Sequence, residues 1–258
     1  MKKIIFSILL ITGCWVWGFA QNAEEIVAKT RAKTSVNSVG TRSRIEIQKS
    51  GKALSALLID QYSAKDKSGL QRTLIEFKEP ANAKGIRFLM LEQKNGSMDQ
   101  RIYLPKLGKV QRVSAESQGD EAFMGTDFSY NDISFLDRDV KLDSYRIIRE
   151  ENYNEKNCYV IEAVPKDKNY AYSKTILWIE KDSNLFFKGE FYGKDGNLKK
   201  IMELSNYKTS GGIITPYTTK LTTVKPDTAT IINLEKIQYG MNIPDGVFTT
   251  KYLETGKR

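Results

Sequence analysis

The side chains that could do chemistry in this sequence are carboxylates, because the chain contains no histidine. Its absence excludes Ser/His and Cys/His catalysis, histidine-based zinc sites and the most common general base near neutral pH. Two acidic clusters remain, Asp137-Arg138-Asp139 and Glu150-Glu151. Paired carboxylates can serve glycoside hydrolysis or calcium binding, but acidic residues beside arginine and lysine in loops more often form a solvated face. We therefore predict a non-enzymatic protein with no catalytic residue, no metal site and no cofactor.

The other candidate groups are equally sparse. Cys158 lies in the run Asn157-Cys158-Tyr159-Val160-Ile161, which is typical of a strand, and we expect it to be a small buried apolar residue. No phosphate-binding loop and no GxGxxG pattern occurs. The formal net charge of +9 is spread along the chain, which favours weak attraction to anionic lipid surfaces over a nucleic-acid site.

The most distinctive stretch is Phe123-Met124-Gly125-Thr126-Asp127-Phe128-Ser129-Tyr130. Glycine adopts a positive φ without steric cost, so Gly125 predicts a tight turn. A short helix over residues 131–136 should follow, capped by Asp127 or Ser129. A cap is a better interpretation of Asp127 than a catalytic role. The aromatic residues of this stretch either anchor a core or line an apolar cavity.

Large apolar side chains that a curled sheet could place inside are numerous in this sequence. An ordinary filled core would explain them, but flexible methionine and aromatic side chains also suit a surface that repacks around an acyl chain. The residues that we predict to line such a cavity, or its lid, are Phe88, Met90, Leu91, Ile102, Leu104, Phe123, Met124, Phe128, Tyr130, Phe135, Trp178, Phe187 and Phe191.

The elements that must position these residues are mostly strands. Asn22 predicts the cap of one amphipathic helix over residues 22–34, with a Glu25–Lys29 pair on its surface and an apolar face formed by Ala23, Ile26, Val27 and Thr30. From residue 40 onward the apolar period changes from 3.6 to 2, with explicit turn residues between the runs. The run 86–92 is apolar on both faces, with Phe88 and Met90 on one and Leu89 and Leu91 on the other, so both faces should be covered.

Together these runs predict a mainly β fold in one domain, residues 21–258. About 10 to 11 strands joined by short turns form an antiparallel meander, and a sheet of that length must curl, split or close. The helix near the start and the short helix near the middle would fill the concave side. We therefore expect an incomplete antiparallel β-barrel with helices over its concave face, and a cavity wherever they leave a gap.

The N-terminus predicts export. Met1-Lys2-Lys3 precedes an uncharged apolar run over residues 4–20, which is typical of a secretory signal peptide. Cleavage after Ala20 would release a periplasmic protein that retains Cys158 alone, so no internal disulfide could form. Residues 11–14 also resemble a lipobox, and acylation of Cys14 would instead anchor the protein to the outer membrane. We favour cleavage after Ala20 and expect a monomer that does not bind nucleic acid.

Short motifs spread over nearly the whole chain after residue 20 resemble those of a known family. They are Pro80 with Lys84-Gly85-Ile86-Arg87-Phe88-Leu89, Ile102-Tyr103-Leu104-Pro105 with Gly108-Lys109-Val110, the run 123–132, Trp178-Ile179, Pro216, Thr228 and Phe248. The family is that of the outer-membrane lipoprotein-sorting (LolA-like) proteins of bacteria, and the greatest similarity is to a largely uncharacterised LolA-like branch found in spirochaetes and other diderms. The run Met-Gly-Thr-Asp-Phe-Ser-Tyr is the most specific part of the resemblance.

The resemblance implies an incomplete barrel closed by helices over a hydrophobic cavity. It implies a periplasmic carrier that binds the acyl chains of lipoproteins or lipids and delivers them towards the outer membrane. The partners it implies are the acylated cargo, an inner-membrane donor transporter and an outer-membrane acceptor. In the best-studied carriers an arginine holds the lid helices closed, and the resemblance assigns that role to no residue here. The alternative is a non-enzymatic envelope sensor or surface-binding module on the same scaffold.

Overall fold

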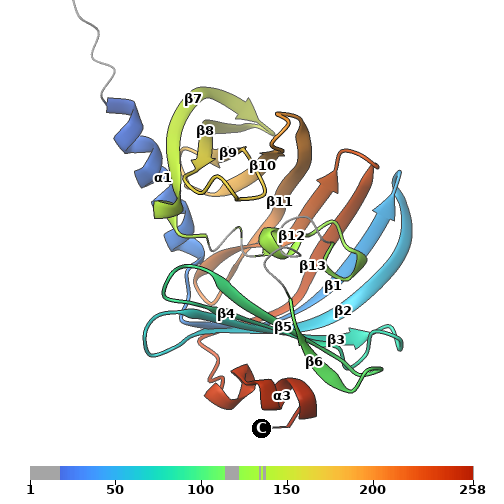
Figure 1. The fold of residues 1–258 in the computed structure, drawn as a ribbon. Helices are drawn as coiled ribbons and strands as arrows, with labels where there is room; N and C mark the ends of the chain where they lie inside the picture. The colour runs from blue at the N-terminus through green and yellow to red at the C-terminus, as the bar shows by residue number, and fades with distance from the viewer. Residues whose placement is uncertain (1–17, 114–121, 134, 136–137, 258) are drawn as a thin grey trace, which may run out of the picture.

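A single curved β-sheet organises the computed structural model, which describes residues 18–113, 122–133, 135 and 138–257. Its 13 strands are antiparallel in the order β6-β5-β4-β3-β2-β1-β13-β12-β11-β10-β9-β8-β7. The two outer strands, β6 and β7, do not pair with each other, so the sheet curls without closing (Figure 1). The predicted incomplete antiparallel barrel is confirmed, although the described residues form more strands than the 10 to 11 expected. Each run between turns pairs as a separate strand, including the four-residue β6.

The strands form two meanders that meet at the β1–β13 pair. The first arm comprises β1 (Ser38–Lys49), β2 (Lys52–Lys65), β3 (Gln71–Glu79), β4 (Arg87–Glu92), β5 (Met98–Leu104) and β6 (Lys109–Arg112). The second comprises β7 (Asp143–Tyr153), β8 (Lys156–Pro165), β9 (Lys174–Glu180), β10 (Phe186–Tyr192), β11 (Leu198–Ser210), β12 (Ile213–Thr223) and β13 (Thr228–Tyr239). Because β6 and β7 lie at opposite edges, the chain between them, here called the crossing chain, must pass from one edge of the sheet to the other. Its described residues Phe123 and Phe128 are buried in the apolar clusters of the concave side.

Strand β4 shows how both faces of the first arm are covered. Phe88 and Leu89 are each 0% exposed, although alternation along a strand places them on opposite faces. Phe88 belongs to a concave cluster with Phe77 and Phe123, as predicted for its face. Leu89 packs on the convex face against residues near the C-terminus. The expectation that this strand is covered on both sides is confirmed.

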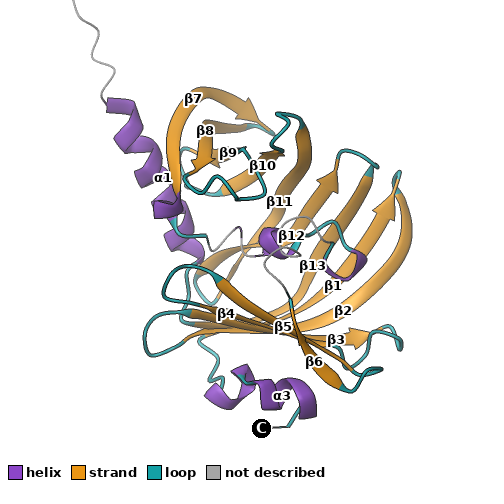
Figure 2. Ribbon diagram, in the orientation of Figure 1, coloured by secondary structure: helices purple, strands orange, loops and turns teal. Residues whose placement is uncertain are grey.

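The convex cover is a C-terminal tail that the sequence patterns did not reveal. It consists of the 3₁₀ turn η4 (Asp245–Phe248) and the short helix α3 (Thr250–Thr255), which lie on the outer side of the β4–β6 arm (Figure 2). Thr249 caps α3 by accepting from the backbone N–H of Tyr252 at 3.1 Å. Arg87 of β4 donates to the carbonyl of Leu253 at 2.6 Å, which attaches the helix to the sheet.

Leu253 is the buried anchor of this tail, at 0% exposed. We expect Leu253→Ala to lower the free energy of unfolding by about 3 kcal/mol, the usual cost of a cavity left by a core leucine. Chemical denaturation followed by circular dichroism measures this. Leu107→Ala is the matched control, because Leu107 is 54% exposed and should change stability by less than about 0.5 kcal/mol. Equal effects of the two substitutions would contradict an anchoring role for the tail.

Helix α1 (Gly18–Thr34) lies along the second arm and packs on β7, β9 and β12. Ala23, Ile26 and Val27 are buried in the core cluster of that arm, which confirms the predicted apolar face. Lys29 and Glu25 form the expected exposed ion pair at 2.7 Å. The predicted cap at Asn22 is wrong, because the helix already begins at Gly18. No helix among the described residues is long and apolar enough to span a membrane.

From residue 122, the described part of the crossing chain forms a tight loop and continues into a short helix on the concave side (Figure 1). The loop contains the 3₁₀ turn η1 (Phe123–Gly125), in which Gly125 has the predicted positive φ, at 75°. Helix α2 (Tyr130–Ile133) follows and is shorter than the expected 131–136. Residues 134, 136 and 137 lie outside the described residues, and η3 (Val140–Leu142) leads into β7.

Candidate functional site

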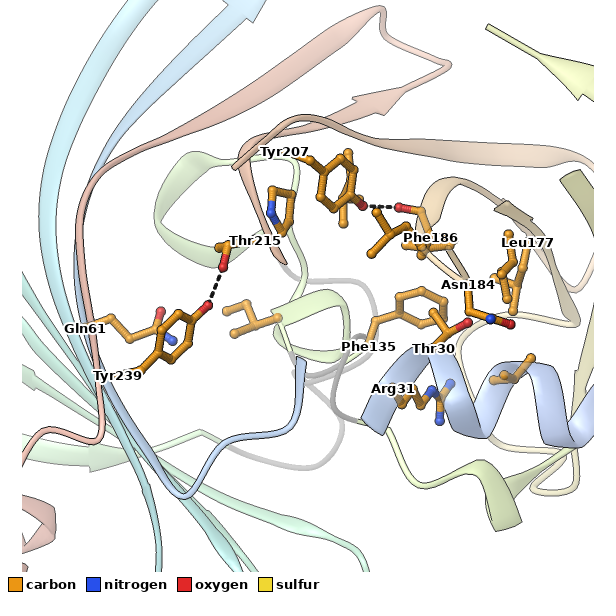
Figure 3. Close-up of a pocket in the computed structure, with 16 residues that line it drawn as sticks. Thr30, Arg31, Gln61, Phe135, Leu177, Asn184, Phe186, Tyr207, Thr215 and Tyr239 are labelled. Carbon is orange, nitrogen blue, oxygen red and sulfur yellow. Dashed lines mark hydrogen bonds between the residues drawn. The ribbon is translucent and has the colours of Figure 1, made fainter. Parts of the chain in front are cut away.

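The main candidate site is a cavity of about 300 Å³ between α1 and the inward-facing side chains of the sheet. The labelled residues in Figure 3 form a row from Gln61 and Tyr239 at one end to Leu177 and Asn184 at the other, with α1 alongside. The apolar lining includes Val27, Phe135, Leu177, Ile179, Phe186 and Leu204. The polar lining includes Arg31, Gln61, Asn184, Tyr207, Thr215 and Tyr239.

Several polar groups at the edge of this cavity are already paired within the protein. The Tyr207 hydroxyl donates to the carbonyl oxygen of Phe186, and the hydroxyls of Thr215 and Tyr239 are 2.6 Å apart. Burial raises the pKa of Tyr207, so this hydroxyl stays a neutral donor at physiological pH. No carboxylate is among the described lining residues. The site therefore offers shape and apolar surface rather than acid–base chemistry.

A second cavity, of about 160 Å³, lies on the same concave side. It is lined by isoleucines of the first arm, by residues of η1 and the loop after it, and by residues of β11 and β13. Gln61 and Ile133 line both cavities. The residues that line only the smaller one include Ile45, Ile59, Phe123, Phe128, Met202 and Ile232.

Asp127 attaches the crossing chain to strands β12 and β13 through hydrogen bonds. Its carboxylate accepts from the hydroxyls of Thr223 at 2.5 Å, Thr230 at 2.8 Å and Thr228. Its backbone N–H donates to the Thr230 oxygen at 2.8 Å. Asp127 is only 8% exposed, and a buried carboxylate requires such partners. The interpretation of Asp127 as a helix cap is wrong, because its side chain joins the loop to β12 and β13.

Ser129 provides the cap of α2 instead. The N–H of Asp132 donates to the Ser129 hydroxyl at 3.3 Å, and the N–H of Ser129 donates to Asp132 Oδ2 at 2.7 Å, which is a reciprocal capping box. Asp132 is 2% exposed. It also accepts from Lys200 Nζ at 2.6 Å and from the Tyr172 hydroxyl at 2.6 Å. Burial and this carboxylate raise the pKa of Tyr172.

The acidic clusters have structural partners in this fold. Arg138 forms a buried ion pair with Asp143 at 3.0 Å, and Asp139 caps η3 by accepting from the N–H of Lys141 at 2.9 Å. Asp137 lies outside the described residues. Glu151 accepts from Arg149 at 2.7 Å, and Lys181 lies against Glu150. Within the described ranges, no group of three or more histidine, cysteine or acidic side chains could hold a metal ion.

Three of the predicted cavity residues do line a cavity. Phe135 borders the larger one, and Phe123 and Phe128 border the smaller one. Phe191 is fully buried behind Phe135, with their ring centroids 4.7 Å apart. The side chain of Tyr130 lies outside the described residues.

Five further predicted residues belong to the packed wall around Phe123. Phe88, Met90 and Ile102 are buried in the concave cluster that contains Phe123, and Leu104 and Met124 pack partly buried against it. The rings of Phe88 and Phe123 lie 4.8 Å apart. These side chains support the smaller cavity without being part of its described lining.

The structure places three predicted residues away from both cavities. Leu91 packs against the cluster under the C-terminal tail, on the convex face. Trp178 also lies on the convex face, in a buried cluster with Cys158 and Val160. Leu177 and Ile179, on the other side of the same strand, line the larger cavity instead. When both faces of a strand are apolar, the sequence does not show which face lies on the concave side of the sheet.

The third displaced residue, Phe187, is explained by a local irregularity. The pairing of β10 with β9 shifts register between Phe186 and Lys188, and such a bulge reverses the alternation of faces along a strand. Phe186 therefore lines the larger cavity, while Phe187 is partly exposed and packs against Tyr207 with the rings tilted and their centroids 5.2 Å apart. Without this bulge, alternation from the buried Phe191 would place Phe187 on the concave face.

Other lining residues were missed because their signal is weak in sequence. Val27 and Thr30 lie on the predicted apolar face of α1, and Arg31 follows them. Tyr207 and Tyr239 come from long strands with little apolar alternation. Cys158 is 0% exposed, as predicted, and burial raises the pKa of its thiol.

Comparison with known proteins identifies the family. The model of a family described as an uncharacterized protein matches residues 69–255, and no curated protein matches the sequence. The chain is similar to a domain from Vibrio parahaemolyticus provisionally assigned to outer membrane lipoprotein sorting, with 25% identity, a TM-score of 0.83, and coverage of 91% of this chain and 99% of the other. It is also similar to a DUF1329 family protein from Desulfovibrio piger ATCC 29098, with 26% identity, a TM-score of 0.85, and coverage of 91% and 98%.

A third solved structure shares the fold. It is a LolA superfamily protein from Nitrosomonas europaea, with 19% identity, a TM-score of 0.72, and coverage of 91% of this chain and 99% of the other. The TM-scores of 0.72 to 0.85 show that these three structures share the overall architecture of this chain. The chain belongs to the family of uncharacterized proteins whose model it matches, and it shares the fold of the outer-membrane lipoprotein-sorting (LolA-like) proteins.

Proposed function

We propose that this protein is a periplasmic carrier that binds the acyl chains of lipoproteins or lipids and delivers them towards the outer membrane. The observation that carries the proposal is the cavity between α1 and the concave face, whose apolar lining residues come from the second arm of the sheet, from α1 and from the chain that contains Ile133 and Phe135. Its volume of about 300 Å³ lies at the lower end of the range for small-molecule sites, about 300 to 1,000 Å³. An elongated row of lining residues suits a linear chain.

An acyl chain needs a carrier because its exposure to water costs a large amount of free energy. Each CH₂ group removed from water contributes about 0.8 kcal/mol, so an acyl chain does not cross an aqueous compartment unescorted. Transfer then requires only that the affinity for the chain increases from donor to carrier to acceptor. The proposal includes an inner-membrane donor transporter, an outer-membrane acceptor, a monomeric carrier and no enzymatic step. It also includes removal of a signal peptide over residues 1–20, of which residues 1–17, with Cys14, lie outside the described residues.

A cavity-filling variant tests the proposal. Leu204 lines the larger cavity and is 5% exposed, so Leu204→Trp should fill it and weaken binding of a dansyl-labelled fatty acid by about 10-fold or more. Leu107→Trp, at an exposed position, is the control and should bind like the wild type. Thermal melting of both variants shows whether they fold.

Native mass spectrometry of the purified wild-type protein provides a second readout that requires no substitution. We expect lipid or acylated peptide to remain bound, and organic extraction should release it. An empty wild-type protein that also fails to bind the labelled fatty acid would refute the proposal. Recovery of one protein partner by crosslinking, without lipid, would instead favour a binding module on the same scaffold.

A further inference from the structure

The two concave cavities meet at Ile133. This residue ends α2 and, together with Gln61 of β2, lines both the larger and the smaller cavity. It also packs against both of the apolar clusters on the concave side, one in each arm. On β11, Met202 lines the smaller cavity and Leu204, two residues on, lines the larger one. Because residues two apart share a face of a strand, the two cavities are neighbours along one surface.

The position of Ile133 is fixed by its own helix. The Ser129–Asp132 capping box, the Lys200–Asp132 ion pair and the Tyr172 hydrogen bond all act on α2 within a few residues of Ile133. Asp127 holds the preceding loop to the sheet. Because these interactions hold the backbone of α2 in place, the side chain of Ile133 lies at a fixed position between the two cavities.

What the smaller cavity offers to a ligand is apolar. Three of its polar lining groups are engaged within the protein: the Thr126 hydroxyl donates to the carbonyl of Phe123 at 2.6 Å, Thr230 donates to Asp127, and Asp132 is held as described. The rest of the lining is mainly isoleucine and phenylalanine. A small cavity with such a lining is suited to hold hydrocarbon rather than water.

We propose that Ile133 sets the length of acyl chain that the carrier accepts, and that the smaller cavity is a subsite for the terminal carbons of a longer chain. This inference rests on the proposed function of the larger cavity. The wild-type protein accommodates a chain that ends at Ile133. Removing the branched side chain joins the two cavities and admits several further carbons, each of which strengthens binding by about 4-fold.

The test compares Ile133→Ala with Leu204→Ala. Both substitutions remove the same number of carbon atoms, but Leu204 lines only the larger cavity, so its truncation widens that cavity without joining the two. Each protein is incubated with an equimolar mixture of lauric, myristic, palmitic and stearic acids, and the bound acids are counted by native mass spectrometry. We expect Ile133→Ala to raise the ratio of stearic to lauric acid about 10-fold or more over the wild type, and Leu204→Ala to leave it within about 2-fold.

Two outcomes separate the inference from the function beneath it. Wild-type protein that binds acyl chains, with equal shifts for the two variants or none, would overturn the role of Ile133 alone. Wild-type protein that binds none of the four acids would overturn the carrier function and the inference with it. If Ile133→Ala fails to fold in a thermal melt, the milder Ile133→Val should still shift the preference towards longer chains, and no shift there overturns the inference.

Discussion

Replacing Asp127 with alanine is expected to lower the free energy of unfolding by about 4 kcal/mol. The carboxylate accepts hydrogen bonds from the hydroxyls of Thr223, Thr228 and Thr230, and it is almost fully buried. Each buried donor left without an acceptor costs about 1 to 3 kcal/mol. Urea denaturation monitored by circular dichroism gives the free energy directly, provided that the transition remains two-state.

Asp182→Ala is the matched control, because this aspartate is exposed on the turn after β9. It should change stability by less than about 0.5 kcal/mol. Asp127→Asn keeps the size of the side chain but removes its charge, so its loss of stability should lie between those of Asp127→Ala and Asp182→Ala. An Asp127→Ala protein as stable as the control would show that the three threonines find other partners and that the loop is held by its aromatic residues alone.

The second large effect is expected at Lys200. Its ammonium group lies 2.6 Å from Asp132 Oδ2 and 2.7 Å from the backbone carbonyl of Asp127. The side chain of Asp132 is 0% exposed and that of Lys200 is 15% exposed. Breaking such a pair from one side leaves a buried charge uncompensated, so Lys200→Met should destabilise the protein by about 3 to 5 kcal/mol. Urea denaturation measures the loss.

A double substitution identifies the cause of that loss. Replacing Asp132 by asparagine in the Lys200→Met protein removes the stranded charge, so much of the lost stability should return. Lys220→Met is a control on the neighbouring strand β12, where the side chain has no ion pair among those described and is half-buried. If the double variant is as unstable as Lys200→Met, the lysine acts by packing or through the Asp127 carbonyl instead of through charge.

These two residues make the crossing chain a structural part of the cavity. A loop that only covered the concave side could move aside for a ligand, whereas Asp127 and Lys200 attach this loop to β11, β12 and β13. The larger cavity is then bounded by this attached loop on one side and by α1 on the other.

Several features followed from the sequence alone, because they depend on local composition and period. The missing histidines excluded most catalytic chemistry, and the period of 2 with turn residues between runs predicted an antiparallel sheet too long to stay flat. The alternation in β4 showed that Phe88 and Leu89 face opposite sides and that both must be covered. The apolar face of α1 was correctly placed for the same reason. The motifs after residue 20 were sufficient to suggest the family.

Other features depended on contacts between distant parts of the chain, and only the tertiary structure decided them. The partners of Asp127 are about 100 residues away in sequence, so a cap was the only local role available to predict. Trp178 and Leu177 are equally apolar neighbours, and the direction of sheet curvature alone determines which of them lines the cavity. Because of a single bulge, Phe186 lines the larger cavity in place of the predicted Phe187. The partition at Ile133 exists only because the crossing chain, fixed at Asp127 and Asp132, brings that residue between two cavities formed by strands from both arms.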